Sequence, residues 1–449
     1  MSPPGAGRQA VRTSLPSRSM ADVDVVVVGA GMAGVVAART LTARGLSVVV
    51  LEAESHTGGR IRTERRPGLR LEHGGIFHTH GYRAMAQLLR EVGLDGETVA
   101  IPTGFHTALR RGGTWHHVDY GSVPGPLRTS ALSVRDKVSV LKAAGPILVS
   151  RPKDLGDLVS FAGRDSRAVT DGLTPTAGGW FTAAPHEFLW GVTSDQLSAA
   201  MLALQLHVFS GQLREIAGGA DRLVTTLAQG LDVRHDTPVD QVEDTGDGVV
   251  VHARGEQITA RRAVLACPAD VTARIWTQAP APVAAHLTIP YSRIDYVYLR
   301  TREAISLTAQ GRPVGMEVVT TPEVGQATMG GIYLANSWAE EGGLLLVTAA
   351  RPARAEDLDD TELADRLQVD VEKYHPEVVG QVTDRVVMRH QPYTPTFGPG
   401  TVRRLAAARA VLPAGNVDLA GDHMTAPWVD GAIRSGQQAA ERITDHLGA

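Results

Sequence analysis

The stretch Asp22–Thr63, DVDVVVVGAGMAGVVAARTLTARGLSVVVLEAESHTGGRIRT, carries the clearest structural pattern in this chain. Val23 and Val25–Val28 form a short apolar, β-branched run, which is typical of a strand buried on both faces. Three glycines in G-x-G-x-x-G spacing follow, and then a helical pattern runs from Met32 to Arg44. A second apolar run, Leu46 to Leu51, ends at Glu52. This order predicts a βαβ unit that binds a dinucleotide.

Each part of this unit has a physical role. The glycines permit a tight turn and let backbone N–H groups approach a diphosphate, to which the helix N-terminus offers partial positive charge. The carboxylate at the end of the second strand would accept hydrogen bonds from ribose hydroxyls. A tight turn without a ligand is the structural alternative. The residues predicted to contact the dinucleotide here are Gly29, Gly31, Met32, Ala33, Gly34, Glu52 and Ala53.

The segment His56–Thr63, HTGGRIRT, adds a second glycine pair and two arginines that nicotinamide-binding folds do not need. Together with the first stretch it resembles the FAD-binding signature of the flavin-containing amine oxidase superfamily. That superfamily also holds protoporphyrinogen oxidases and phytoene-desaturase-like enzymes. The resemblance implies FAD as cofactor, with Gly59 and Arg60 against its diphosphate. A solvated turn is the alternative for the arginines.

The resemblance also assigns residues further along the chain. It places the segment after Gly74 and Gly75, including Ile76, along the isoalloxazine ring, and Val239 against the adenine. His78 and His80 then become candidates for lining the reaction site, the alternative being ordinary polar residues of a loop. We predict no metal site, because no carboxylate or thiol accompanies these histidines at ligand spacing.

The C-terminal segments Asn416–Asp422 and Trp428–Gly436 resemble the closing motif of the same superfamily. The resemblance implies cofactor contacts from Gly421, Asp422, Trp428, Val429 and Ala432, with Asp422 as the acid that binds the ribityl or diphosphate region. It makes Trp428 one aromatic of a cage facing the flavin and Phe397 a weaker partner on the opposite wall. A core anchor is the alternative for Trp428.

We expect an α/β fold in which a Rossmann-type FAD-binding domain is interleaved with a mixed α+β substrate domain. A helical substrate segment follows the first FAD-binding segment, with helices predicted over 85–92, 133–148, 154–161, 166–173 and 198–209 and a hairpin over 105–119. We expect an antiparallel sheet in the second substrate segment, residues 285–387. The predicted boundaries are a disordered tail 1–20, FAD-binding segments 21–83, 214–284 and 388–449, and substrate segments 84–213 and 285–387.

One departure from the superfamily concerns a strand of that sheet. Many amine oxidases of the superfamily carry a lysine on the strand equivalent to Tyr291–Leu299, and this chain reads YSRIDYVYL there. The role of that lysine is therefore unfilled, with Arg293 or Asp295 as neighbouring candidates.

Composition excludes several classes of function. A net charge of −4 gives no reason to expect nucleic acid as a partner. The one cysteine excludes an intrachain disulfide and suits a reducing cytoplasm, where we expect the protein. No run of residues is long and apolar enough for an integral membrane span, and the first 20 residues lack the apolar core of a secretory signal. Met20 stands just before the first strand and is an alternative start.

The leading hypothesis is an FAD-dependent oxidase or desaturase that takes a hydride from a bulky, largely apolar small molecule, by resemblance an isoprenoid, tetrapyrrole or secondary metabolite. O₂ is the expected electron acceptor, and a homodimer is left open. The alternatives are a flavin amine oxidase, which the missing lysine disfavours, and an isomerase whose flavin does not turn over. A membrane-surface carrier using the helix at 130–150 is disfavoured, because that helix is not strongly basic.

Overall fold

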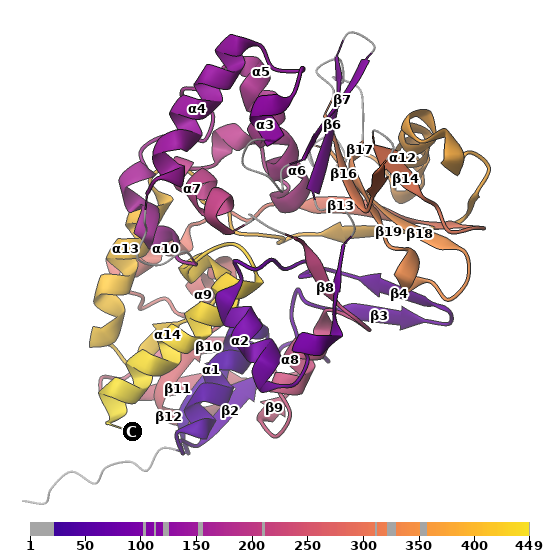
Figure 1. Ribbon diagram of the computed structural model, residues 1–449. Helices are drawn as coiled ribbons and strands as arrows, with labels where there is room; N and C mark the ends of the chain where they lie inside the picture. The colour runs from indigo at the N-terminus through magenta and orange to yellow at the C-terminus, as the bar shows by residue number, and fades with distance from the viewer. Residues whose placement is uncertain are drawn as a thin grey trace, which may run out of the picture.

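The computed structural model describes residues 22–448, apart from 102–104, 112–113, 120–124, 151–155, 209–211, 310–311, 321–328 and 351–356. The predicted tail 1–20 lies outside the described residues. Figure 1 shows three parts: a sheet with its helices at the bottom, a layer of helices at the upper left and a second sheet at the right.

The first sheet has seven strands and is built around β1 (Val23–Val28). Val27 pairs in parallel register with Val264 on one side and Val50 on the other, and all three side chains are fully buried. Helices cover both faces of such a sheet, which is why its strands read as continuous valine runs. The remaining strands are β2 (Val48–Leu51), β9 (Asp232–Arg234), β10 (Val239–Asp244), β11 (Val249–Ala253), β12 (Glu256–Leu265) and β20 (Val417–Leu419).

Two helices from opposite ends of the chain pack against each other on this sheet. They are α1 (Met32–Ala43) and α14 (Val429–Leu447). Their backbones approach so closely that a Cβ on Gly436 would overlap the carbonyl oxygen of Ala33. The N-terminal and C-terminal segments therefore form one structural unit.

The second sheet also has seven strands, in the order β19-β13-β18-β17-β16-β6-β7. All neighbours are antiparallel except β16 and β6. Helix α12 (Asp360–Tyr374) covers one face, against Val297 and Leu299. The opposite face carries Tyr296 and Tyr298. The strands are β6 (Phe105–Arg111), β7 (Thr114–Asp119), β13 (Ile294–Thr301), β16 (Met316–Thr320), β17 (Met329–Leu334), β18 (Gly343–Ala349) and β19 (Val382–His390).

The helical layer differs from the prediction in two places. Residues 166–173 form turns and a bridge from Ala168 to Ser198 instead of a helix, and residues 158–164 form the 3-10 helix η2. The first two residues of the helix predicted over 154–161 lie outside the described residues. The helices of this layer are α3 (Gly125–Arg128), α4 (Val134–Leu148), α5 (Pro175–Ala177), α6 (Ala184–Trp190), α7 (Ala199–Val208) and α13 (Thr401–Val411).

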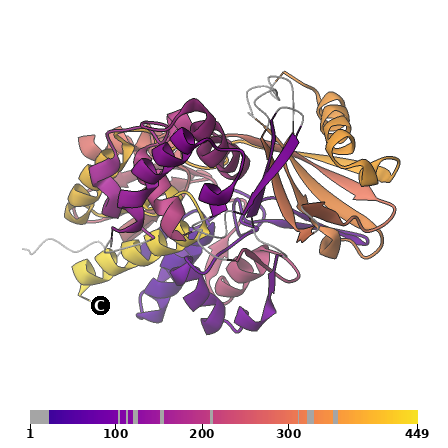
Figure 2. The same ribbon diagram turned by 45° about the horizontal axis from the view of Figure 1, so that its top comes forward.

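Figure 2 shows the second sheet beside the helical layer.

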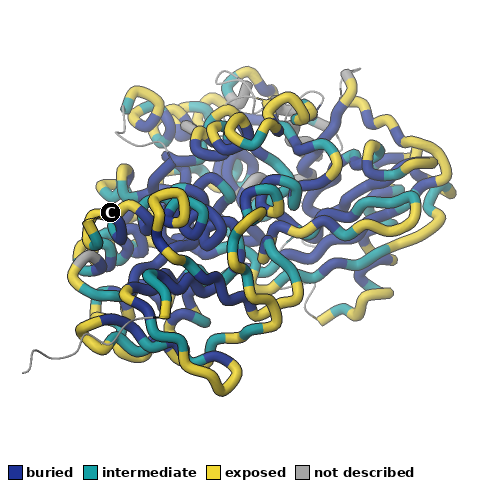
Figure 3. The backbone as a smooth tube through the Cα atoms, turned by 90° about the horizontal axis from the view of Figure 1, so that it is seen from below, coloured by how far each residue is buried: buried dark blue, intermediate teal, exposed yellow. Residues whose placement is uncertain are grey.

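One predicted domain boundary, at residue 387, falls inside β19, which pairs with β13 along its length. Figure 3 shows buried residues running through the interior of the molecule and exposed residues along its outline. Further short elements are β3 (Thr63–Arg66), β4 (Leu69–Glu72), α2 (Arg83–Glu91), β5 (Thr98–Ala100), β8 (Arg214–Ile216), α8 (Asp221–Leu227), α9 (Ala269–Ile275), α10 (Ala281–Leu287), β14 (Leu307–Ala309) and β15 (Arg312–Val314).

Candidate active site

A cavity of about 530 Å³ lies where the three parts meet. Its wall is formed by the carboxyl ends of β1, β2 and β12, the first residues of α1 and α14, and one face of β13 and β18. Ligands of open α/β sheets bind at this end of the strands, where the loops converge.

One end of the cavity is lined by residues of the βαβ unit. Glu52, at the end of β2, is 8% exposed, and its carboxylate accepts hydrogen bonds from the backbone N–H groups of Ala30 (2.6 Å) and Glu54 (2.9 Å). These bonds fix the carboxylate at the cavity wall, beside the loop that begins α1. Both groups come from the segment in which the sequence predicts ribose and diphosphate contacts.

The glycines of this loop have different roles. A Cβ on Gly31 would meet no atom of the described residues within 4 Å, so the space beside it belongs to the cavity. A Cβ on Gly34 would overlap the carbonyl oxygen of Gly29 and approach Ala266 at 3.1 Å. Gly34 therefore permits close packing of helix on strand, and it does not line the cavity.

Arg60 joins the two terminal segments at the cavity wall. One guanidinium nitrogen donates to the carboxylate of Asp422 over 2.8 Å, and the other donates to the carbonyl oxygen of Tyr393 over 2.6 Å. The Arg60 side chain keeps 39% of its surface exposed, whereas Asp422 is buried. A cation is thus held at the wall by an acid that lies behind it, a suitable arrangement for binding a diphosphate.

Helix α14 begins at the same wall. Val429 and Ala432, in its first turn, line the cavity, and Trp428 is the N-cap residue. Unpaired backbone N–H groups at a helix N-terminus place partial positive charge there, which stabilises an anionic group of a ligand.

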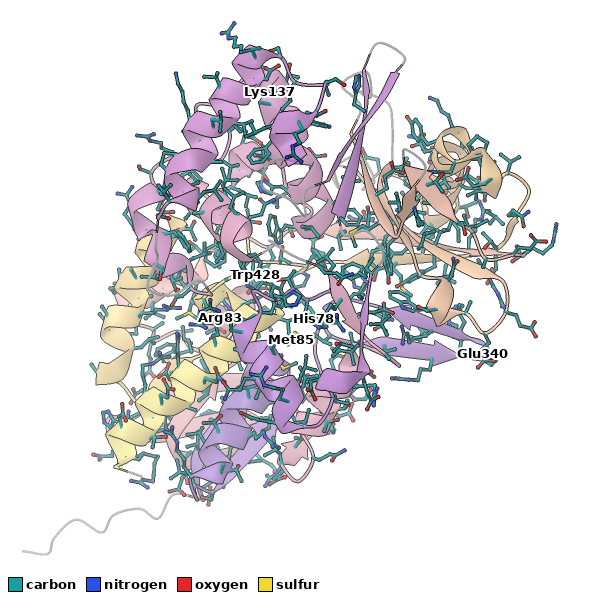
Figure 4. The ribbon with its side chains drawn as sticks, in the orientation of Figure 1. His78, Arg83, Met85, Lys137, Glu340 and Trp428 are labelled. Atoms are coloured by element: carbon teal, nitrogen blue, oxygen red, sulfur yellow. The ribbon has the colours of Figure 1, made fainter. Side chains whose placement is uncertain are left out.

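The other end of the cavity is aromatic. The Trp428 ring lies 6.0 Å from the ring of Tyr82 in a stacked arrangement and 6.0 Å from the ring of Trp190 in a tilted one. Tyr296 and Tyr393 also line the cavity. Figure 4 shows Trp428 near the middle of the molecule, between the three parts. We call Tyr82, Trp190, Tyr296, Tyr393 and Trp428 the aromatic end.

Strand β13 presents Ile294 and Tyr296 to this end. Side chains alternate along a strand, so Asp295 faces α12, where it is fully buried and paired with Arg293 at 3.0 Å. Neither Arg293 nor Asp295 lines the cavity. The two neighbouring candidates for the unfilled role of the superfamily lysine are therefore not on the cavity wall, where this strand carries an aliphatic and a phenolic side chain.

Burial favours the neutral forms of two histidines and a tyrosine on the cavity wall. Burial lowers the pKa of His73 and His423, two imidazoles that line the cavity. Burial raises the pKa of Tyr393 to about 12, so its phenol keeps its proton. Acidic side chains among the described lining residues are Glu52 and Glu54 after β2, and Asp422, which is paired with Arg60.

Three predicted reaction-site residues lie elsewhere. His78 is 5% exposed and exchanges backbone hydrogen bonds with Arg214, and burial lowers the pKa of its imidazole to about 4. His80 is exposed. Phe397 is fully buried in the core beside the helical layer. None of the three lines the cavity, so Phe397 is not the opposite wall to Trp428, and Trp190 and Tyr82 are the rings beside it.

The structure brings most of the other predicted site residues together. Of the residues predicted to contact cofactor, all but Gly34 line the cavity: Gly29, Gly31, Met32, Ala33, Glu52, Ala53, Gly59, Arg60, Gly74, Gly75, Ile76, Val239, Gly421, Asp422, Trp428, Val429 and Ala432. The cavity is also lined by Tyr82, Tyr296 and Tyr393, which we did not predict from the sequence as site residues. The alternation of Ile294, Tyr296 and Tyr298 was a signal for one face of a strand, but the sequence did not say which face meets the cavity.

Comparisons with known proteins agree with the family resemblance seen in the sequence. The family model for flavin containing amine oxidoreductases matches residues 32–444. Putrescine oxidase from Kocuria rosea is 30% identical over 308 residues, which cover 61% of this chain and 62% of that protein. The chain therefore matches less than two thirds of the length of that curated relative.

Solved structures agree in fold. Cyclohexylamine oxidase from Brevibacterium oxydans superposes with a TM-score of 0.77 at 21% identity, covering 95% of this chain and all of that one. A protoporphyrinogen oxidase-like structure from Exiguobacterium superposes with a TM-score of 0.74 at 17% identity, again over 95% of this chain. At these identities the likeness shows the fold.

Proposed function

Because the chain belongs to the flavin containing amine oxidoreductase family, we propose that it is an FAD-dependent oxidase or desaturase of a bulky, largely apolar small molecule. The observation that carries this proposal is the aromatic end of the cavity, which is walled by neutral rings and aliphatic side chains. An apolar wall with few polar groups selects ligands by shape and buried apolar area.

The residues of the cavity fit FAD. The empty space beside Gly31 would accept a diphosphate, Arg60 would neutralise part of its charge, and Glu52 would bind a ribose. The N-terminus of α14 would stabilise negative charge on the flavin ring. When bound, FAD supplies the two-electron chemistry, taking a hydride from the substrate.

The protein's own part is orientation and exclusion of water. Trp428, held between Tyr82 and Trp190, presents a rigid face against which a flat or chain-like apolar substrate would lie. The Tyr393 phenol and the neutral His73 would contact substrate without adding charge. We propose O₂ as electron acceptor and the cytoplasm as location.

The relatives favour a second candidate, oxidation of an amine, since putrescine oxidase and cyclohexylamine oxidase are among them. A flexible dication would find no unpaired carboxylate among the described residues of the aromatic end. An apolar cyclic or aryl amine, entering as the neutral base, suits these walls better.

Anaerobic mixing tests both candidates. The holoenzyme is mixed with polycyclic or isoprenoid alcohols and olefins, with apolar cyclic amines and with putrescine, and the flavin's visible absorbance is followed. Bleaching by an apolar molecule without nitrogen supports the first candidate. Bleaching by amines alone, with release of H₂O₂ in air, supports the second. A substrate converted without any bleaching would replace both with a non-redox role for the flavin.

A further inference from the structure

Helix α4 presents a row of apolar side chains to solvent. Val134 is 80% exposed and Leu141 is 51% exposed, and Val149, the residue after the helix, is 81% exposed. Val138 and Leu148 are exposed as well, and the spacing of four, three and seven residues places the helical ones on one face. Five of the eight large exposed apolar residues in the described part of the chain belong to this row.

The opposite face of α4 holds the helix in the fold. Val140, Ala144 and Ile147 are buried, and the helix packs on α7 and α5. A Ser133–Asp136 capping box fixes its start. The exposed row is therefore an outer surface of a firmly anchored helix and has no packing role inside the protein.

Positive charge flanks this row. Arg135 and Lys142 are exposed and Lys137 is half-buried. The one acid in the helix sequence, Asp136, is 6% exposed and accepts hydrogen bonds from Ser133 within the capping box. The sequence analysis disfavoured a membrane-surface role because this helix is not strongly basic. In the structure the Asp136 carboxylate is buried, so the exposed charges of the helix are cationic.

The distribution of lysine points to the same surface. Two of the chain's four lysines, Lys137 and Lys142, lie on α4 next to the exposed apolar row. Figure 4 shows Lys137 far from Trp428, and Figure 1 shows α4 along the outer edge of the helical layer.

We propose that the outer face of α4 docks on an anionic lipid bilayer surface. Its valine and leucine side chains would insert at the boundary between headgroups and acyl chains, while Arg135, Lys137 and Lys142 would meet lipid phosphates. A second copy of the chain suits this face less well, because a symmetric contact places the same cations against each other. The inference does not depend on the substrate.

The test is flotation of the FAD-loaded full-length protein with vesicles of phosphatidylcholine alone or mixed equally with phosphatidylglycerol. We expect recovery with anionic vesicles to exceed that with neutral vesicles by about tenfold or more, and to fall with added salt. The variants V138S/L141S and K137Q/K142Q should each lose most of this binding. The control V369S/K373Q alters an exposed valine and a lysine on α12, also a helix of 15 residues, and should bind like the wild type.

Flavin absorbance and melting temperature establish that each variant is folded. Failure of the wild type to float with anionic vesicles would overturn the proposal, as would equal binding by all variants. Light scattering at several protein concentrations gives the remaining outcome. Self-association that V138S/L141S abolishes, without vesicle binding, would assign the face to a second copy and also reject the lipid surface.

Discussion

The guanidinium of Arg60 donates to the carboxylate of Asp422 over 2.8 Å, although 362 residues separate them in the sequence. The contact connects the loop after β2 with the loop after β20, and both residues line the cavity. The pair therefore joins the two ends of the chain at the cavity wall.

We expect Arg60→Gln to weaken FAD binding by about tenfold to a hundredfold, since a hydrogen bond to a charged group contributes about 1.5–3 kcal/mol. Fluorescence titration of the apoprotein with FAD measures the change. Arg65→Gln is the matched control, because Arg65 also pairs with an acid, Asp221, at 2.8 Å but lies outside the cavity wall. Equal losses in the two variants would contradict the assigned role of Arg60.

Two glycine substitutions should affect different properties, one FAD binding and the other the stability of the apoprotein. Gly31→Ala should leave the apoprotein's melting temperature nearly unchanged and abolish most FAD binding, because its Cβ would project into the cavity. Gly34→Ala should lower apoprotein stability by about 3 kcal/mol or more, because its Cβ would overlap the carbonyl oxygen of Gly29. Thermal melts and flavin titration of both apoproteins check this, and a stable, FAD-binding Gly34→Ala protein would be inconsistent with the packing.

Glu72 gives the protein a pH dependence that can be measured. Burial raises the pKa of this carboxyl from 4.5 to about 6. The folded protein therefore holds the proton more tightly than the unfolded chain. The resulting stability is fully present below pH 4.5 and is lost as the pH rises through about 6, an effect of about 2 kcal/mol.

The variant Glu72→Gln removes this titration, so its stability should vary less between pH 4.5 and pH 6 than that of the wild type. Denaturant unfolding at fixed pH values measures the difference. Glu64→Gln is the contrasting variant, because hydrogen bonding to Arg66 lowers the pKa of Glu64 and its contribution is lost as the pH falls. The same pH profile in wild type and Glu72→Gln would show that Glu72 is not the group responsible.

The sequence predicted the cofactor half of the molecule well because local patterns determine it. Glycine spacing, the valine strands and the acid at Glu52 are contiguous signals. The structure forms the βαβ unit from them and brings Gly29, Gly31 and Glu52 to one cavity wall, whereas Gly34 packs against Gly29 and Ala266. The closing segment Trp428–Gly436 was also recognisable from the sequence, and it lies at the start of α14, which spans Val429–Leu447. Such motifs carry their own geometry, so no knowledge of distant contacts was needed.

The aromatic end of the cavity was less predictable, because it is assembled from segments that only tertiary packing brings together. Phe397 and Trp428 both looked like wall aromatics, yet one lies in the core and the other beside the cavity. Tyr296 was missed because alternation in β13 gives two faces without saying which one meets α12. Residues 166–173 have a helical pattern, but Ala168 instead bridges to Ser198.

That difference between Trp428 and Phe397 leads to a paired experiment. Trp428→Leu should keep FAD but raise the dissociation constant of an apolar substrate by about tenfold, because it removes the ring that contacts Tyr82 and Trp190. Phe397→Leu should lower the free energy of unfolding by about 1–2 kcal/mol and leave that constant unchanged, since the side chain is fully buried away from the cavity. The constant comes from the substrate dependence of anaerobic flavin bleaching, and stability comes from denaturant unfolding. If Phe397→Leu weakened substrate binding while Trp428→Leu did not, the aromatic end would have been assigned to the wrong rings.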